Sequence, residues 1–182
     1  MAKFFPAIDD AHRAFIEAQP MYFVATAAPD GRVNLSPKGY DSLRILGPNR
    51  VAWSNLTGSG NETAAHLAVQ DRITVMFMST ATRPMIMRLF GRARALHRAD
   101  SDWADLRDLL PRLPGARQII DMQVETVQTS CGYGVPLMRM TGERDTLLHW
   151  AEDKGEDGVR TYWRDRNATS IDGLPTGINK AL

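Results

Sequence analysis

Cysteine is nearly absent from this sequence of 182 residues, because Cys131 is the only one. A single cysteine excludes an intrachain disulfide. It also forms no zinc-binding spacing with the four scattered histidines, so no metal site is expected. An excess of charge is missing too, since 22 Lys and Arg residues face 21 Asp and Glu residues, a formal net charge of +1. This balance gives no indication of a nucleic acid or an anionic membrane as a partner.

Long apolar runs are also missing. No segment approaches the roughly 20 apolar residues that a membrane span needs, and the N-terminal stretch MAKFFPAIDD lacks the apolar run of a signal peptide. We therefore expect a cytoplasmic protein without a membrane association. The length favours a single domain over residues 1–182.

Short strand patterns joined by turns dominate the first two thirds of the chain. They predict strands at residues 21–28, 32–36, 42–46, 50–54, 72–79, 85–97 and 118–128. Helical patterns occupy residues 9–19, about 61–70 and 101–110, and two more, separated by Gly155, form a helical C-terminal extension from about residue 143. Gly91 interrupts one strand, where we expect a bulge or a close backbone approach. The order predicts a mainly β fold with flanking helices, an antiparallel barrel.

One stretch, VAWSNLTGSGNETAAHL at residues 51–67, passes from an apolar strand through a glycine-rich loop into a helix. Gly58 and Gly60 allow a tight turn, and Ser59 and Glu62 have the spacing of a capping box, which predicts a helix start at about Asn61. The free N–H groups of a helix start attract anions, so the loop suits a phosphate. An ordinary strand-to-helix turn is the alternative interpretation.

The same loop resembles a dinucleotide-binding fingerprint only in part. Its third position is Thr63 instead of Gly or Ala, and the next strand, at residues 72–79, is followed by no acidic residue for a ribose. The predicted helix is also short for a crossover between parallel strands. We therefore set a Rossmann fold aside.

Basic residues near this loop support an anionic ligand. Lys38 follows a strand at a bend, and Arg88, Arg92 and Arg94 share one face of another strand with Phe90. A row of guanidinium groups beside a helix start would bind a phosphate well. A solvated basic face is the alternative. No nucleophile–base pair is evident among the histidines and Cys131, which favours chemistry borrowed from a cofactor.

Several segments taken together resemble the pyridoxamine 5′-phosphate oxidase-like FMN-binding split-barrel family. They are VNLSPKG, WSNLTGSGNETAAHL, RITVMFM and RLFGRAR, in that order and spacing. The later TSCGYGVP and DGLPTG segments resemble an uncharacterised flavin-nucleotide-binding subgroup of this family. The resemblance implies an antiparallel split barrel that binds FMN at the interface of a homodimer and acts as an oxidoreductase on an unknown small molecule.

The resemblance also implies which residues bind the cofactor. Asn34, Leu35, Ser36 and Lys38 would line the isoalloxazine edge, and Trp53, Ser54 and Asn55 would approach the ring and ribityl chain. Asn61 and Thr63 would bind the phosphate at the helix start, with Arg88 reaching the phosphate or the ring. Tyr133 and Arg139, in or just after TSCGYGVP, are candidates for the substrate side, although a packed turn and a solvated arginine would also explain them.

The helix start departs from the oxidase pattern. Asn61-Glu62-Thr63 stands where the oxidases carry a Ser-Arg-Lys run, so two phosphate-binding cations are absent, and Arg88 or Arg92 would have to compensate. The substrate elements of the oxidase tail have no clear match either. A deazaflavin-dependent reductase, or a flavin- or haem-binding protein without turnover, therefore remain alternatives to an FMN oxidoreductase.

Overall fold

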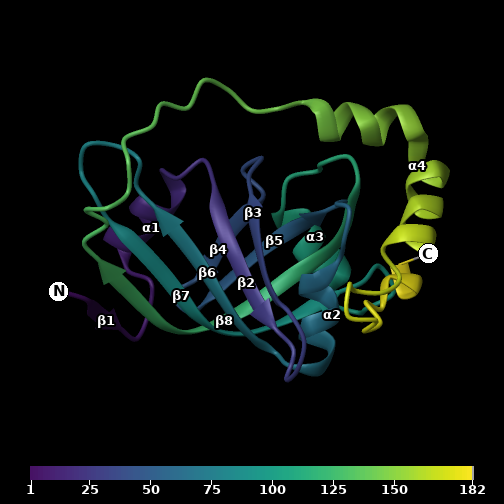
Figure 1. The fold of residues 1–182 in the computed structure, drawn as a ribbon, viewed down its shortest axis with the longest axis horizontal. Helices are drawn as coiled ribbons and strands as arrows, with labels where there is room; N and C mark the ends of the chain where they lie inside the picture. The colour runs from purple at the N-terminus through teal and green to yellow at the C-terminus, as the bar shows by residue number, and fades with distance from the viewer. Residues whose placement is uncertain (182) are drawn as a thin grey trace.

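The structure, a computed structural model, describes residues 1–181 and is dominated by one antiparallel sheet of eight strands (Figure 1). The strands are β1 (Lys3–Phe5), β2 (Tyr22–Ala27), β3 (Val33–Lys38), β4 (Leu43–Gly47), β5 (Arg50–Leu56), β6 (Arg72–Met78), β7 (Ile86–Leu96) and β8 (Ala116–Ser130). The helices are α1 (Asp10–Glu17), α2 (Glu62–Val69), α3 (Trp103–Leu109) and α4 (Thr146–Arg166), followed by the 3₁₀ helix η1 (Ile178–Ala181).

The sheet curls into a barrel that stays open. Its strand order is β3-β2-β6-β7-β8-β5-β4, every pairing is antiparallel, and β1 adds to β8. Within residues 1–181, β3 and β4 end the order and do not pair with each other, so the barrel is split. The predicted antiparallel split barrel is confirmed.

The seven predicted strands all form, and the sequence reading missed only β1 among the strands that the structure describes. This strand has three residues, too few for a recognisable pattern, and it forms because Phe4 and its neighbours pair with the end of β8. The predicted interruption at Gly91 is confirmed. The register of β7 and β8 shifts between Phe90 and Gly91, and a Cβ atom on Gly91 would lie 2.0 Å from the carbonyl oxygen of Gln123.

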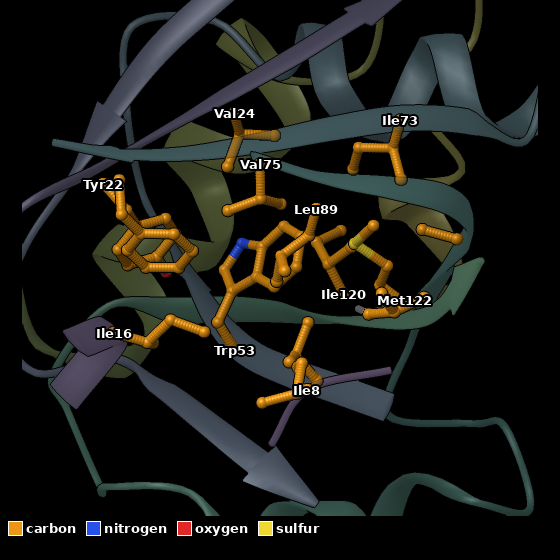
Figure 2. Close-up of a cluster of buried hydrophobic side chains, with 14 of the residues drawn as sticks. Ile8, Ile16, Tyr22, Val24, Trp53, Ile73, Val75, Leu89, Ile120 and Met122 are labelled. Carbon is orange, nitrogen blue, oxygen red and sulfur yellow. The ribbon is translucent and has the colours of Figure 1, made fainter. Parts of the chain in front are cut away.

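The barrel interior is an apolar core around Trp53, as Figure 2 shows. Alternate residues of each strand face inward, because successive side chains of a strand point to opposite faces. On β2, Tyr22 and Val24 are buried, and on β6, Ile73 and Val75 are buried. The Tyr22 and Trp53 rings meet edge to face with centroids 6.1 Å apart. Closely packed apolar surface of this kind is the main source of folding stability.

The C-terminal extension lies at the margin of the barrel. A long crossing segment, residues 131–145, connects the end of β8 to α4 and arches over the sheet in Figure 1. The helix α4 is bent at Gly155, whose φ of 65° departs from helical geometry, as the predicted break between two helices requires. Trp163 and Ile178 bury a small second core there. None of the helices in residues 1–181 combines the length and hydropathy needed to cross a membrane.

Candidate functional site

A cavity of about 690 Å³ opens beside the start of α2, between edge strand β3, the end of β5 and the C-terminal extension. Its size is typical of a small-molecule or cofactor site. The wall is built from the end of β3 with residues 37–40, the end of β5 with the glycine-rich loop 57–60, the first turn of α2, one residue of β8, and residues of α4 and the tail. Segments far apart in the sequence therefore meet at one site.

Six of the ten predicted cofactor-binding residues line this cavity. They are Asn34, Ser36, Lys38, Ser54, Asn55 and Thr63. The three from β3 are alternate residues, which places them on one face of that strand. The prediction that the VNLSPKG segment and the glycine-rich loop meet at one site is therefore correct in its geometry.

Two of the other predicted residues are excluded from the cavity wall by strand geometry. Leu35 alternates with Asn34 and Ser36, so it faces the opposite side and is 64% exposed. Trp53 is fully buried in the barrel core, where its ring packs beside Tyr22. We therefore correct the expectation that these two side chains line the cavity.

Asn61 and Arg88 are also displaced from their expected positions. Asn61 is buried behind the wall, where its Oδ1 accepts a hydrogen bond from Asn55 Nδ2 at 3.4 Å. Arg88 extends from β7 towards Ser130, with 3.5 Å between Nη1 and Oγ. Neither residue lines the cavity, so the contact of Arg88 with a ligand stays a prediction that this cavity does not support.

The rest of the predicted arginine row belongs to the outer surface. Arg92 binds Asp71 and Glu125, while Arg94 binds Asp102 and Asp121. Arg92 therefore lies outside the cavity wall and is already paired with carboxylates, which does not support its expected role as a compensating cation. On the opposite face of β7, the alternate residues Leu89, Gly91 and Ala93 are buried against the core.

The two substrate-side candidates lie away from the cavity wall. Tyr133 is 83% exposed and Arg139 is exposed as well, both in the crossing segment 131–145. The interpretation of Arg139 as a solvated arginine agrees with the structure. Tyr133 is solvated instead of part of a packed turn, which corrects that alternative, and its substrate-side role stays a prediction.

The helix start forms where it was predicted, but not by a capping box. Asn61 is the N-cap of α2 and makes no side-chain capping bond. Both carboxylate oxygens of Glu62 instead accept from the backbone N–H of Ile171, at 3.1 and 3.2 Å. The Glu62 carboxylate thus accepts from the C-terminal tail instead of from the backbone of its own turn.

A polar network supports the wall behind Thr63. Asn34 Nδ2 donates to the hydroxyl oxygens of Thr63 and Thr26, at 3.1 and 3.3 Å, and the Thr26 hydroxyl is 3.1 Å from Nδ1 of His66. His66 is buried, which agrees with its interpretation as a packing residue. The network fixes the rotamers of Asn34 and Thr63 at the cavity.

Lys38 supplies one positive charge to the cavity. The structure records no hydrogen bond or ion pair for its ammonium group within residues 1–181. Burial, with a smaller contribution from nearby Arg117, lowers the pKa of Lys38 from 10.5 to about 8. The charged form is therefore costly while no anion is present.

Arg117 supplies a second positive charge, and the sequence reading missed it. The side chain is 3% exposed, and burial lowers the pKa of its guanidinium from the usual value. Nη1 donates to Oδ1 of Asn167 at 2.5 Å and Nη2 donates to the carbonyl of Gly60 at 2.9 Å, while Nε has no partner in the described chain. No signal in the sequence distinguishes it, because Arg117 stands beside Gln118 in a strand that carries several other polar residues.

Further buried donors without partners surround the same wall. Asn55 Nδ2 also donates to Oε1 of Gln118 at 3.1 Å. Within residues 1–181, Nδ2 of Asn61, Nε2 of Gln118 and the Ser36 hydroxyl have no hydrogen-bond partner. Unsatisfied buried donors are rare in folded proteins, and of these three only the Ser36 side chain belongs to the cavity wall, where its hydroxyl could bind a ligand.

Comparisons with known proteins agree with this fold. A profile of the family described as pyridoxamine 5′-phosphate oxidase matches residues 8–131. The pyridoxamine 5′-phosphate oxidase family protein ustO of Aspergillus flavus is 37% identical over an alignment of 202 residues, which covers 100% of this chain and 80% of the relative.

Solved structures share the fold at low identity. HupZ of Group A Streptococcus superposes with a TM-score of 0.54 at 20% identity, covering 66% of this chain and 91% of that one. The FAD binding protein of Mycobacterium smegmatis gives 0.51 at 10% identity, covering 70% and 98%. From the profile match and the fungal relative, this chain belongs to the pyridoxamine 5′-phosphate oxidase family.

Proposed function

We propose that this chain binds FMN in the cavity beside α2 and acts as an FMN-dependent oxidoreductase on a small molecule. The observation that carries the proposal is a pair of cations, the half-buried Lys38 and the buried Arg117, which line one cavity and have no ion-pair partner in the described residues. An anionic ligand would offset the cost of burying both charges. The shared fold with a protein named for FAD binding supports a flavin.

The residues present fit the chemical needs of FMN. The start of α2 offers backbone N–H groups and the Thr63 hydroxyl to a phosphate, while Ser54 and Asn55 offer polar contacts to a polyol. Lys38 would stabilise the negative charge of a reduced ring, because a nearby cation favours an anion. Bound FMN would supply the hydride chemistry for which the side chains show no nucleophile–base pair.

We propose in addition that the chain is a homodimer with the cofactor near the interface. Val33 and Leu35 on edge strand β3 are 74% and 64% exposed, and Leu137 in the crossing segment is 74% exposed. A second copy would cover such apolar side chains. Light scattering should give twice the chain mass, and Leu35→Asp should halve it; a monomeric wild type would reject the dimer. A cytoplasmic location remains a prediction of the sequence.

Flavin titration tests the cofactor directly. Purified protein mixed with FMN should show a shifted visible spectrum and quenched flavin fluorescence. Lys38→Ala and Thr63→Ala should each weaken binding by about 10- to 100-fold, the equivalent of one charge-assisted hydrogen bond of about 1.5–3 kcal/mol. Cys131→Ser is the control, because Cys131 is exposed outside the cavity wall. Failure of the wild type to bind FMN would reject the proposal.

Two further measurements separate the alternatives. Tighter binding of a deazaflavin or of haem than of FMN would replace the cofactor assignment. Steady-state oxidation of a reduced nicotinamide by the FMN-loaded protein, above the rate of free FMN, supports an enzyme. Tight binding without any turnover, with a panel of reduced and oxidised small molecules, would favour a storage or sensing protein.

A further inference from the structure

The first turn of α2 has no cation of its own to offer a phosphate. Its first residues are Glu62, Thr63 and Ala64, and the only charged side chain among them is acidic. The N–H groups of the turn attract an anion, but the Glu62 carboxylate beside them repels one. A phosphate subsite at this turn therefore needs a cation from another part of the chain.

Arg117 of β8 is placed to provide that cation. Its guanidinium lines the cavity and lies against the loop before α2, where Nη2 donates to the carbonyl of Gly60 at 2.9 Å. A guanidinium has five N–H donors, and the structure assigns partners to Nη1 and Nη2 but leaves buried Nε without one in residues 1–181. A nearly fully buried arginine without a carboxylate is costly unless an anion binds it.

Asn167 fixes the orientation of this guanidinium. Asn167 is the C-cap of α4 and is fully buried. Its Oδ1 accepts from Arg117 Nη1 at 2.5 Å, and its Nδ2 donates to the carbonyl of Gly58 at 3.1 Å. One amide side chain thus holds both the cation and the glycine-rich loop.

The C-terminal extension holds Asn167 in turn. The Thr176 hydroxyl donates to the backbone carbonyl of Asn167 at 2.5 Å, and the indole N–H of Trp163 donates to the hydroxyl of Thr57 at 2.7 Å. The tail also binds Glu62 through the backbone N–H of Ile171, which holds this carboxylate away from an ion pair with Arg117. Residues beyond α4 therefore determine where Asn167 and Glu62 lie in a site whose other walls come from β3, β5 and α2.

We propose that Arg117 is the cation of the phosphate subsite and that Asn167 is its positioning residue, so that the C-terminal extension completes the cofactor site. This inference rests on the proposed binding of FMN. It assigns the discrimination between FMN and riboflavin, which differ only in the phosphate, to Arg117 of β8 and to the end of α4, which lies beyond the residues that the family profile matches.

The test compares dissociation constants for FMN and riboflavin. Arg117→Met keeps an apolar side chain of similar length but removes the charge, so it should weaken FMN binding by about 10- to 100-fold and change riboflavin binding less than about threefold. Asn167→Asp should act in the same direction, because the new carboxylate would pair with Arg117 and compete with the phosphate. Arg92→Met, on the outer face of β7, is the matched control and should alter neither constant.

The salt dependence gives a second readout that a purely structural role would not change. Wild-type affinity for FMN should fall with added salt, and this slope should be smaller in Arg117→Met. Thermal unfolding of each variant confirms that it folds. Equal losses for FMN and riboflavin in the folded variants would overturn the subsite, whereas a wild type that binds neither flavin would reject the proposed function itself.

Discussion

Cations occur in two contrasting settings in this molecule, and Arg92 and Arg94 illustrate the first. On the outer face of β7, each of them binds two carboxylates, at N–O distances between 2.6 and 3.2 Å. In the cavity, Lys38 and Arg117 meet no carboxylate in the described residues. The pKa of each outer arginine is raised, mainly by hydrogen bonds to carboxylates, whereas burial lowers the pKa of each cavity cation.

The contrast shows why side-chain type alone does not identify a ligand-binding cation. The outer arginines are already neutralised by the protein, so a phosphate there would have to displace carboxylates. The cavity cations are partly or fully withdrawn from solvent and have no ion-pair partner in the described residues, so an anion that binds them displaces no carboxylate. Four tests, from the largest expected effect to the smallest, can break or sharpen this distinction.

Removal of both arginines around Asp121 should have the largest effect. Asp121 is 9% exposed and binds Arg50 and Arg94. The double substitution Arg50→Met and Arg94→Met should lower the free energy of unfolding by about 2–3 kcal/mol, because it leaves a buried carboxylate unpaired. Urea unfolding measures this loss, and addition of Asp121→Asn should recover part of it. A change in FMN affinity would mean that these outer charges act on the site.

The substitution Lys38→Met should weaken FMN binding but raise the thermal stability of the FMN-free protein. It should weaken FMN binding by about 1.5–3 kcal/mol, since it removes a charge-assisted contact to the ligand. It should also raise the Tm of the FMN-free protein at pH 7, because burial disfavours the charge and holds the pKa of Lys38 at about 8. Calorimetry and flavin titration check both. A lower Tm together with unchanged affinity would place Lys38 among the structural cations.

The affinity for FMN should depend on pH through Lys38. In the free protein this group loses its proton as the pH rises through about 8, while a bound anion would favour the protonated form and raise the pKa. Affinity should therefore be constant below pH 8 and fall by at most about tenfold per pH unit above it. Titrations at pH 7, 8 and 9 test this, with Lys38→Met expected to show no such fall. An affinity that increases with pH would contradict the assignment.

Substitution of a single outer arginine should have the smallest effect. Arg92 is exposed, and its ion pairs with Asp71 and Glu125 are screened by solvent. Arg92→Met should leave both the Tm and the FMN dissociation constant unchanged within error. A measurable loss of FMN binding would restore Arg92 as a cation of the site.

Much of the fold was predictable from the sequence because the signals are local. Alternation in residues 72–79 and 118–128 indicated strands, and Gly91 indicated the close backbone approach that the structure shows. The sequence also predicted that a segment of β3 contributes residues to the site. The resemblance indicated the whole segment from Asn34 to Lys38. It did not say which of these residues face the cavity, and strand alternation places Leu35 on the opposite face.

The sequence could not predict the role of Arg117 as the second cavity cation or of Asn167 as the residue that holds it. Arg117 and Asn167 are 50 positions apart, and Asn167 and Gly58 are 109 apart, so no spacing rule connects them. The capping box failed for the same reason. Glu62 met a backbone N–H of the tail, at Ile171, and this long-range bond replaced the local one.

By itself, the sequence determined the positions of seven strands along the chain, the absence of an intrachain disulfide, and the glycine-rich loop before α2. Those properties follow from composition and from contacts between near neighbours in the chain. Only the tertiary structure decided which cations are neutralised and which stay without a carboxylate in the cavity. The reason is physical, because burial and pairing depend on residues brought together from distant segments, and they set the charge that a ligand meets.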